Sequence, residues 1–374
     1  MKNLETLIQE LCPDGVEFVK LGDVLDYEQP TKYIIKCKDY QNEGMPVLTA
    51  GQTFILGYTD ETNGIFEASK ENPVIIFDDF TTSFHWVDFN FKVKSSAMKM
   101  LRVLSEREVS FRFVYYAMKC IKYQSLEHSR QWISKYSQIE IPLPPIEVQT
   151  EIVRILDKFT SLEAELEAEL DCRKRQYEYY RDKLLSFDNV GGQEVEWKTL
   201  GELAEIGTGS SNTKDGLSEG LYPFYTRGQE VLRKNEYEFD DEAIITAGDG
   251  VGVGKVIHYV KGKYALHQRA YRFKPGDLLN ARFLYFYMTS TFYKYVCGNS
   301  VSSSVSSLRK PRLLKYPIPL LPMQEQIRIV SILDRFESLT TSLQSGLPAE
   351  IAARRQQYEH YRDKLLTFKR KGAA

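Results

Sequence analysis

The glycine-rich stretch Gly248–Lys255 (GDGVGVGK) is the first place to look for chemistry, because glycines followed by lysine can cradle a phosphate. The spacing is wrong for a nucleotide loop: Asp249 stands where the pattern needs glycine, and Val256 stands where it needs serine or threonine. The Rossmann-type glycine pattern fails as well, because Val253 takes the place of its last glycine. We therefore expect a tight turn between two strands here.

No other residue pattern supports catalysis. Asp78 and Asp79 are adjacent, so in a strand they point to opposite faces and make a poor pair for a metal-dependent nuclease. The sequence has no Asn-Pro-Pro-aromatic motif of an amino-methyltransferase and no glycine-rich S-adenosylmethionine loop. The five histidines lack metal-ligand spacing: His85, His128, His258, His267 and His360. We expect a chain without catalytic residues, bound metal or bound cofactor.

Cations next to hydroxyl and amide side chains are the second kind of candidate, because such groups contact the phosphates and base edges of nucleic acid. Three stretches of the second half have this character, and arginine and glutamine in them could form bidentate contacts with guanine and adenine. The candidates are Arg227, Gln229 and Lys234; His267, Gln268 and Arg269; and Ser303, Ser304, Arg309, Lys310 and Arg312. The alternative is an ordinary turn, a solvated strand end, and a serine-rich loop before a basic helix.

The first half has two comparable stretches. In Asp78–Phe89 (DDFTTSFHWVDF), the candidate contacts are Thr82, Ser83 and His85, although a histidine and a tryptophan near strands are also typical of a core. In Glu127–Ser137 (EHSRQWISKYS), they are Arg130, Gln131 and Lys135, while Trp132 is expected to be packed. This second stretch lies where the second half has its serine-rich basic segment.

Composition and charge set the wider limits. The chain has 374 residues, which suits two or three domains, and a net charge of −2, which does not by itself advertise a nucleic-acid binder. The distribution is more informative, because residues 278–324 contain no acid while acids gather in Ser161–Asp171. Five scattered cysteines without a C-x-x-C pair indicate a reduced, cytoplasmic setting. The absence of a long apolar run predicts no membrane span.

The chain reads as one unit repeated twice. QYEYYRDKLLSF at residues 176–187 recurs as QYEHYRDKLLTF at residues 357–368, with ten of twelve letters identical. Residues 141–159 (IPLPPIEVQTEIVRILDKF) likewise match residues 318–336 (IPLLPMQEQIRIVSILDRF). A period near 180 residues indicates a domain duplication rather than a solenoid.

Each repeat consists of a globular segment, a proline-containing hinge and a long helical arm. Apolar residues at steps of three and four predict one helix over Glu147–Phe187, about 60 Å long at ~1.5 Å per residue. The second arm should be interrupted at Gly346 and Pro348. We expect α+β globular domains at 1–145 and 188–320, and arms at 146–187 and 321–374 that pack as an antiparallel coiled coil with pseudo-two-fold symmetry.

Two variable globular domains and two near-identical arms that begin IPLPP and end YRDKLL resemble the specificity subunit of type I restriction-modification systems. The resemblance covers essentially the whole chain and implies a non-catalytic DNA-binding subunit. Each globular domain would then be a target recognition domain for one half of a split, non-palindromic site on double-stranded DNA. It further implies two copies of a methyltransferase subunit carrying S-adenosylmethionine, and restriction and translocation subunits that use ATP and Mg²⁺.

The arms would act as a ruler between the two half-sites. Asp157 and Tyr177 are 20 residues apart, whereas Asp334 and Tyr358 are 24 apart. The four extra residues are expected to add about one helical turn, ~6 Å along the arm. Such an insertion would keep the helix faces in phase while shifting the domains along DNA.

The polar residues of the repeated motif also recur, although an apolar helix–helix interface requires only the apolar residues to recur. One interpretation is recent duplication with little drift. The other is a face that docks the same partner twice, through Tyr177, Tyr180, Arg181 and Lys183 and through Tyr358, Tyr361, Arg362 and Lys364. On the second interpretation, charge reversal at the arginines should weaken partner assembly without loss of folding. Two other functions stay open: a stand-alone restriction or modification enzyme, and a coiled-coil scaffold that binds no DNA.

Overall fold

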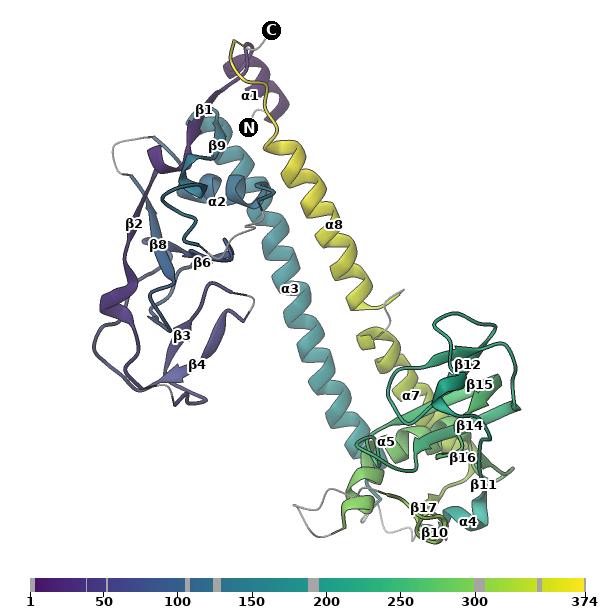
Figure 1. Ribbon diagram of the computed structural model, residues 1–374. Helices are drawn as coiled ribbons and strands as arrows, with labels where there is room; N and C mark the ends of the chain where they lie inside the picture. Colours follow the sequence, from purple (N-terminus) through teal and green to yellow (C-terminus); the bar gives the residue numbers. More distant parts are fainter. Residues whose placement is uncertain are drawn as a thin grey trace. The chain divides into compact units, whose positions relative to one another are not determined.

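A computed structural model describes residues 4–37, 39–51, 53–104, 108–123, 129–187, 195–298, 307–341 and 345–372 (Figure 1). Contacts divide the chain into two compact units, Met1–Glu165 with Ala352–Ala374, and Leu166–Ile351. Each unit therefore contains one globular domain, the start of the helical arm that follows it, and the end of the other arm. The division cuts through both arms rather than at their ends.

The first unit builds its globular domain on a four-stranded sheet of order β2-β8-β5-β6 and a three-stranded sheet of order β4-β3-β7. Apolar side chains fill the central strand β5, whose residues 74–77 are all buried. The strands are β1 (Glu17–Lys20), β2 (Leu25–Glu28), β3 (Met45–Leu48), β4 (Ile55–Thr59), β5 (Val74–Asp78), β6 (Phe84–Val87), β7 (Lys92–Val93), β8 (Met98–Val103) and β9 (Glu140–Leu143). The helices of this domain are α1 (Leu4–Leu11) and α2 (Phe111–Lys119), with short 3-10 turns at Leu21–Asp23, Pro30–Tyr33 and Tyr136–Gln138.

The second unit has a six-stranded sheet of order β11-β16-β14-β15-β12-β13. Its strands are β10 (Glu196–Thr199), β11 (Ala204–Thr208), β12 (Tyr222–Tyr225), β13 (Leu232–Lys234), β14 (Phe239–Ala247), β15 (Ile257–Leu266), β16 (Ala270–Pro275) and β17 (Pro317–Leu320). Its helices are α4 (Leu200–Leu203), α5 (Ala281–Cys297) and α6 (Lys310–Leu314), with a 3-10 turn at Thr213–Asp215. Helix α5 packs on β14, β15 and β16.

The two domains share one framework. The order β2-β8-β5-β6 in the first corresponds to β11-β16-β14-β15 in the second, with antiparallel pairing throughout. In both, the entering strand pairs with the proline-containing hinge strand in the same way, so that Val19 lies opposite Ile141 and Lys198 lies opposite Ile318. The duplication seen in the sequence is therefore a duplication of fold.

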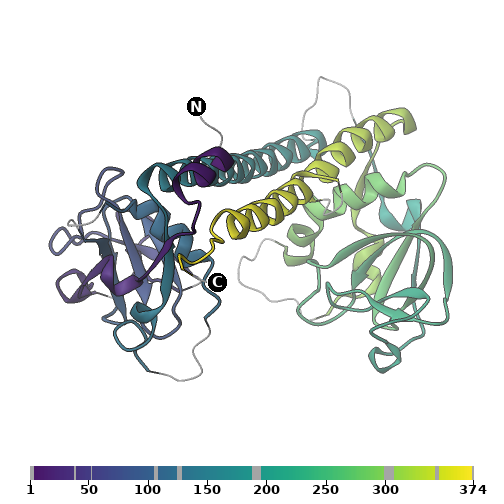
Figure 2. The same cartoon turned by 90° about the horizontal axis from the view of Figure 1, so that it is seen from above.

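The helical arms are α3 (Ile146–Leu185), and α7 (Met323–Thr341) followed by α8 (Leu347–Leu365). The single helix expected over Glu147–Phe187 is confirmed, and so is the interruption beside Gly346 and Pro348. Within the first unit the end of α8 runs antiparallel to the start of α3, since Tyr361 stacks on Phe159 and Arg355 pairs with Glu163. Figure 2 shows α1 beside the first turns of α3 in the same unit.

The longer spacing of the second arm falls where its helix is interrupted. Helix α7 ends at Thr341 and α8 begins at Leu347, so the longer spacing includes the break between them. The expected ruler that is one turn longer stays a prediction. Residues 342–344 lie outside the described part of the chain.

Candidate nucleic-acid interface

Three loops of the second unit meet at one end of its sheet. The turn after β14 carries Asp249, whose Oδ1 accepts a hydrogen bond from Arg227 Nη1 at 2.7 Å and whose Oδ2 accepts one from Arg269 Nη1 at 3.1 Å. Burial opposes ionisation of Asp249, but the two guanidinium hydrogen bonds outweigh it and lower the pKa of this carboxyl. Two sequence candidates from different stretches are thus brought together by a carboxylate that the sequence reading did not include.

The neighbouring candidates are also held by hydrogen bonds. Lys234 Nζ donates to Ser211 Oγ at 2.8 Å, and Gln268 Nε2 donates to Asn212 Oδ1 at 2.5 Å. His267 is buried, with its Nδ1 accepting from the backbone N–H of Arg269 at 3.0 Å, and burial lowers its pKa. His267 therefore shapes the turn and is not available to a groove, whereas Gln268 is exposed.

The basic segment before β17 returns to the same sheet end. The backbone N–H of Leu308 donates to Gly248 O at 2.8 Å, next to Asp249. Arg309 and Gln229 are exposed, Lys310 Nζ donates to Ile206 O at 2.9 Å, and Arg312 Nη2 donates to Tyr295 O at 3.0 Å. Ser303 and Ser304 lie outside the described residues.

The first unit has a buried acid at the corresponding place. Asp79 follows β5, and its side chain is 1% exposed. Its Oδ2 lies 3.7 Å from Lys99 Nζ, which is also 1% exposed, and 3.5 Å from Arg130 Nη1. Its Oδ1 accepts from the backbone N–H of Trp132 at 2.9 Å. Asp79 therefore fixes the segment that carries Arg130 against the end of the sheet.

The candidates of this segment divide into exposed and buried residues. Arg130 and Lys135 are exposed, while Trp132 is packed against Phe77 as expected. Gln131 is fully buried, accepting from Tyr123 Oη at 2.7 Å and donating to Ser129 O at 2.7 Å. The expected DNA contact by Gln131 is therefore wrong, because its amide is already satisfied inside the domain.

The turn between β5 and β6 is tightly built. Asp78 Oδ1 accepts from the backbone N–H groups of Phe80 and Thr81, and Thr82 is buried with a positive φ of 60°. His85 Nε2 contacts Gly51 O at 2.9 Å, and burial lowers its pKa. Thr82 and His85 thus hold the turn in shape, and Ser83 and His85 both keep partial exposure.

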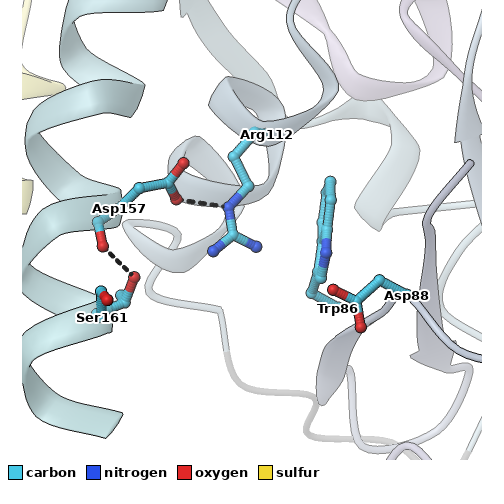
Figure 3. A pocket seen from close by; sticks show the side chains of 6 residues that line it. Trp86, Asp88, Arg112, Asp157 and Ser161 are labelled. Atoms are coloured by element: carbon cyan, nitrogen blue, oxygen red, sulfur yellow. Dashed lines mark hydrogen bonds and ion pairs between the residues drawn. The ribbon is translucent and has the colours of Figure 1, made fainter. Parts of the chain in front are cut away.

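Both domains join their arms through an arginine that sequence reasoning missed. Arg112 Nε donates to Asp157 Oδ1 at 2.8 Å, and its guanidinium lies 4.6 Å from the ring centre of Trp86 (Figure 3). This junction borders an open cavity of about 590 Å³ that Asp88 and Ser161 also line. Its counterpart in the second unit is Arg282, with Nε 2.7 Å from Asp334 Oδ1.

A buried glutamine completes each junction. Gln149 Oε1 accepts from Ser110 N at 2.9 Å and its Nε2 donates to Pro144 O at 2.7 Å. Gln326 repeats this pattern, accepting from Asn280 N at 2.8 Å and donating to Leu321 O at 2.8 Å. The sequence contained a signal for these junction residues, because the glutamines and aspartates occupy matching places in residues 141–159 and 318–336.

The repeated motif makes equivalent contacts within the chain in both copies. In the second unit, Tyr180 stacks on Phe336 with ring centres 5.7 Å apart, and Asp182 Oδ1 accepts from Ser290 Oγ at 3.2 Å. In the first unit, Tyr361 stacks on Phe159 at 5.5 Å, and Asp363 Oδ1 accepts from Cys120 Sγ at 3.6 Å. Each copy thus contacts the domain and arm start of the other repeat, at equivalent positions.

The expected docking face is therefore narrower than the motif. Burial raises the pKa of both Tyr177 and Tyr358 to about 12, and their rings contact Phe336 and Tyr116 respectively. The side chains of Arg181 and Arg362 are largely covered and pair with the aspartates that follow them. The exposed charged residues of the two copies are Glu178, Asp182, Lys183, Glu359 and Lys364.

Charge reversal at Arg181 or Arg362 should destabilise the protein, because each guanidinium stacks near a tyrosine and pairs with its neighbouring aspartate. We expect Arg181→Glu and Arg362→Glu each to lower the free energy of unfolding of its unit by about 1–3 kcal/mol. Lys183→Glu and Lys364→Glu, on exposed side chains, are the controls with changes within ~0.5 kcal/mol. Urea unfolding measures the difference, and equal effects of covered and exposed reversals would contradict this packing.

Among the described residues, no cluster of histidine, cysteine and acidic side chains could hold a metal ion. No helix in the described ranges is both long and apolar enough to cross a membrane.

The comparison with known proteins reflects the duplication of the chain. The family model for the type I restriction modification DNA specificity domain matches twice, at residues 13–171 and 193–353. A type I restriction enzyme EcoR124I/EcoR124II specificity subunit of Escherichia coli is 42% identical, over 98% of this chain and 97% of that protein. A putative type I restriction enzyme specificity subunit of Haemophilus influenzae is 30% identical, over 98% and 100%.

Solved structures show the same fold. The crystal structure of a type I restriction-modification S subunit from M. genitalium superposes with a TM-score of 0.62 at 18% identity, covering 94% of this chain and 96% of that one. A chain from a study of complex assembly and conformational transition of the type I R-M system gives 0.54 at 18% identity, covering 95% and 98%. The two mixed α/β domains and long helices of this chain fit that fold. The chain belongs to the family of type I restriction-modification DNA specificity proteins.

Proposed function

We propose that this chain is the DNA-reading specificity subunit of a type I restriction-modification enzyme, with one half of a split target read by each domain. One observation carries the proposal: at the same end of a shared sheet framework, an acid holds exposed arginine in both domains, Asp79 holding Arg130 and Asp249 holding Arg227 and Arg269. Because the two sets of side chains differ, the two half-sites should differ in sequence. A stand-alone enzyme is not favoured, since the relatives are specificity subunits.

The chain would supply recognition and its partners would supply chemistry. We infer that two methyltransferase subunits carrying S-adenosylmethionine dock on the arms, and that restriction and translocation subunits using ATP and Mg²⁺ join them in the cytoplasm. The exposed charges Glu178, Lys183, Glu359 and Lys364 support a repeated docking face, because they recur at equivalent places in the two copies. The chain itself would bind no cofactor.

The test is to ask which component selects the DNA. Methyltransferase subunits from the same system, purified with and without this chain, are incubated with unmethylated genomic DNA and S-adenosylmethionine, and methylated bases are mapped by long-read sequencing. We expect methylation at one split motif only when the chain is present. The chain alone should transfer no methyl groups. Methyl transfer by the chain alone would instead establish the enzyme alternative.

A further inference from the structure

Asp249 occupies a position where an acid is unexpected in a DNA-binding surface. A carboxylate repels phosphate, and here it lies at the sheet end where the exposed cations of the second domain gather. Asp249 neutralises only part of that charge, because two guanidiniums share it. Such an arrangement suits a residue whose task is to orient the arginines.

The two arginines keep most of their donors available. Each gives one terminal nitrogen to Asp249, and no other hydrogen bond of either guanidinium occurs among the described residues. The side chain of Arg227 is 40% exposed and that of Arg269 is 63% exposed, whereas Asp249 is 24% exposed. An arginine held by one terminal nitrogen still presents Nε and the other terminal nitrogen, the pair of donors that guanine O6 and N7 accept.

The backbone beneath this cluster is fixed by close approaches that only glycine permits. A Cβ on Gly248 would lie 2.6 Å from Arg269 O, and one on Gly252 would lie 2.4 Å from Arg227 O. The glycine-rich stretch Gly248–Lys255 therefore lets the loops carrying Arg227 and Arg269 pack against the Asp249 turn. Its glycines serve this packing rather than a nucleotide.

Comparison with the first domain shows that the acid is placed differently in the common framework. Gly248 N donates to Arg269 O and Gly248 O accepts from Leu308 N, as Asp79 N donates to Ala97 O and Asp79 O accepts from Gln131 N. Gly248 thus stands in the place of Asp79, and Asp249 follows one residue later. The one-residue shift accompanies a change from a buried acid to a partly exposed acid between two exposed arginines.

We propose that Asp249 is a positioning residue that holds Arg227 and Arg269 as guanine-reading side chains for the half-site bound by the second domain. The inference rests on the proposed function and goes beyond it by naming the specificity-determining residues and the base they read. Ordered arginine forks cost less entropy on binding than free ones, so the carboxylate contributes to discrimination although it contacts no DNA.

The experiment uses the complete complex of this chain with its methyltransferase subunits, loaded with S-adenosylmethionine. Initial methylation rates are measured on the mapped target duplex and on duplexes with each base pair of each half replaced in turn. For Asp249→Ala we expect discrimination to fall about 5- to 150-fold at guanine positions of one half only, the range of one bidentate contact. Binding to a non-target duplex should become tighter, because one negative charge is lost.

Controls separate positioning from charge and from folding. Asp240→Ala removes the same charge from an exposed residue at the other end of β14 and should leave discrimination unchanged. Arg269→Lys keeps the charge but lacks the fork, so it should lose discrimination at one of the same guanines, which tests the proposal even if Asp249→Ala does not fold. Unchanged discrimination in either variant overturns the inference while leaving the proposed function standing. A wild-type complex without sequence preference overturns both.

Discussion

Replacing Asp79 with asparagine should cost the first unit about 3–5 kcal/mol, the loss typical of a buried ion pair deprived of one partner. The change leaves Lys99 enclosed at 1% exposure without its carboxylate, and it removes the charge that draws Arg130 to the sheet. Hydrogen exchange measured by mass spectrometry, peptide by peptide, should show the loss in β5, β8 and the segment after residue 129. Peptides of the second unit should exchange as in the wild type.

The same variant should become more stable as pH rises. Burial lowers the pKa of Lys99, and Asp79 counteracts that lowering. Without Asp79 the folded state releases the Lys99 proton more readily than the unfolded chain does, so the unfolded chain binds more protons and stability increases as pH rises toward the ordinary pKa of lysine. The double variant Asp79→Asn/Lys99→Met is the control, since it removes the buried charge and should recover most of the stability with no such pH dependence. A pH-independent loss would show that Lys99 is not the stranded charge.

Replacing Gln149 with alanine should cost about 2–4 kcal/mol, again in the first unit alone. The side chain is buried, and its loss leaves Ser110 N and Pro144 O without partners and opens a cavity. Gln326→Ala should have the same effect in the second unit, where Asn280 N and Leu321 O would be stranded. Each substitution loosens the junction between a recognition domain and its arm.

An exposed neighbour provides the control for the glutamine variants. Thr150→Ala, one position along α3, should change stability by no more than ~0.5 kcal/mol. In the assembled enzyme, the glutamine variants should still select the same bases but methylate them more slowly at a raised temperature. If Gln149→Ala were as stable as Thr150→Ala, the glutamine would not secure the junction.

Much of the architecture could be predicted from the sequence because helical arms are encoded by local periodicity. Steps of three and four between Ile152, Leu156 and Phe159 are enough to predict α3, and Gly346 with Pro348 is enough to predict the break before α8. The length of a spacing was less informative. The four extra residues of the second arm are consistent with an added helical turn or with an interruption of the helix. The structure has an interruption before Leu347.

The site was harder to predict because burial and pairing of a side chain depend on the fold around it. In the sequence Gln131 resembles an exposed residue that contacts bases, but in the fold Tyr123 and Ser129 satisfy its amide. Asp249 is unfavourable for DNA binding by its charge, but in the fold two arginines share that charge. The repeated Arg181 and Arg362 resemble surface charges in the sequence, because the pattern does not show that their side chains are largely covered and paired with the aspartates that follow them. Pattern alone identified the cationic stretches, and only the fold showed which of them meet.

The central claim is that this chain decides which DNA is modified, and mapping of methylated bases tests it most directly. Long-read sequencing of genomic DNA from cells with the gene and from cells lacking it should show one motif that disappears with the gene. We predict two different half-motifs separated by a spacer of fixed length, with methylated adenine in both halves. An unchanged methylation pattern, or loss of a single contiguous palindrome, would contradict the account.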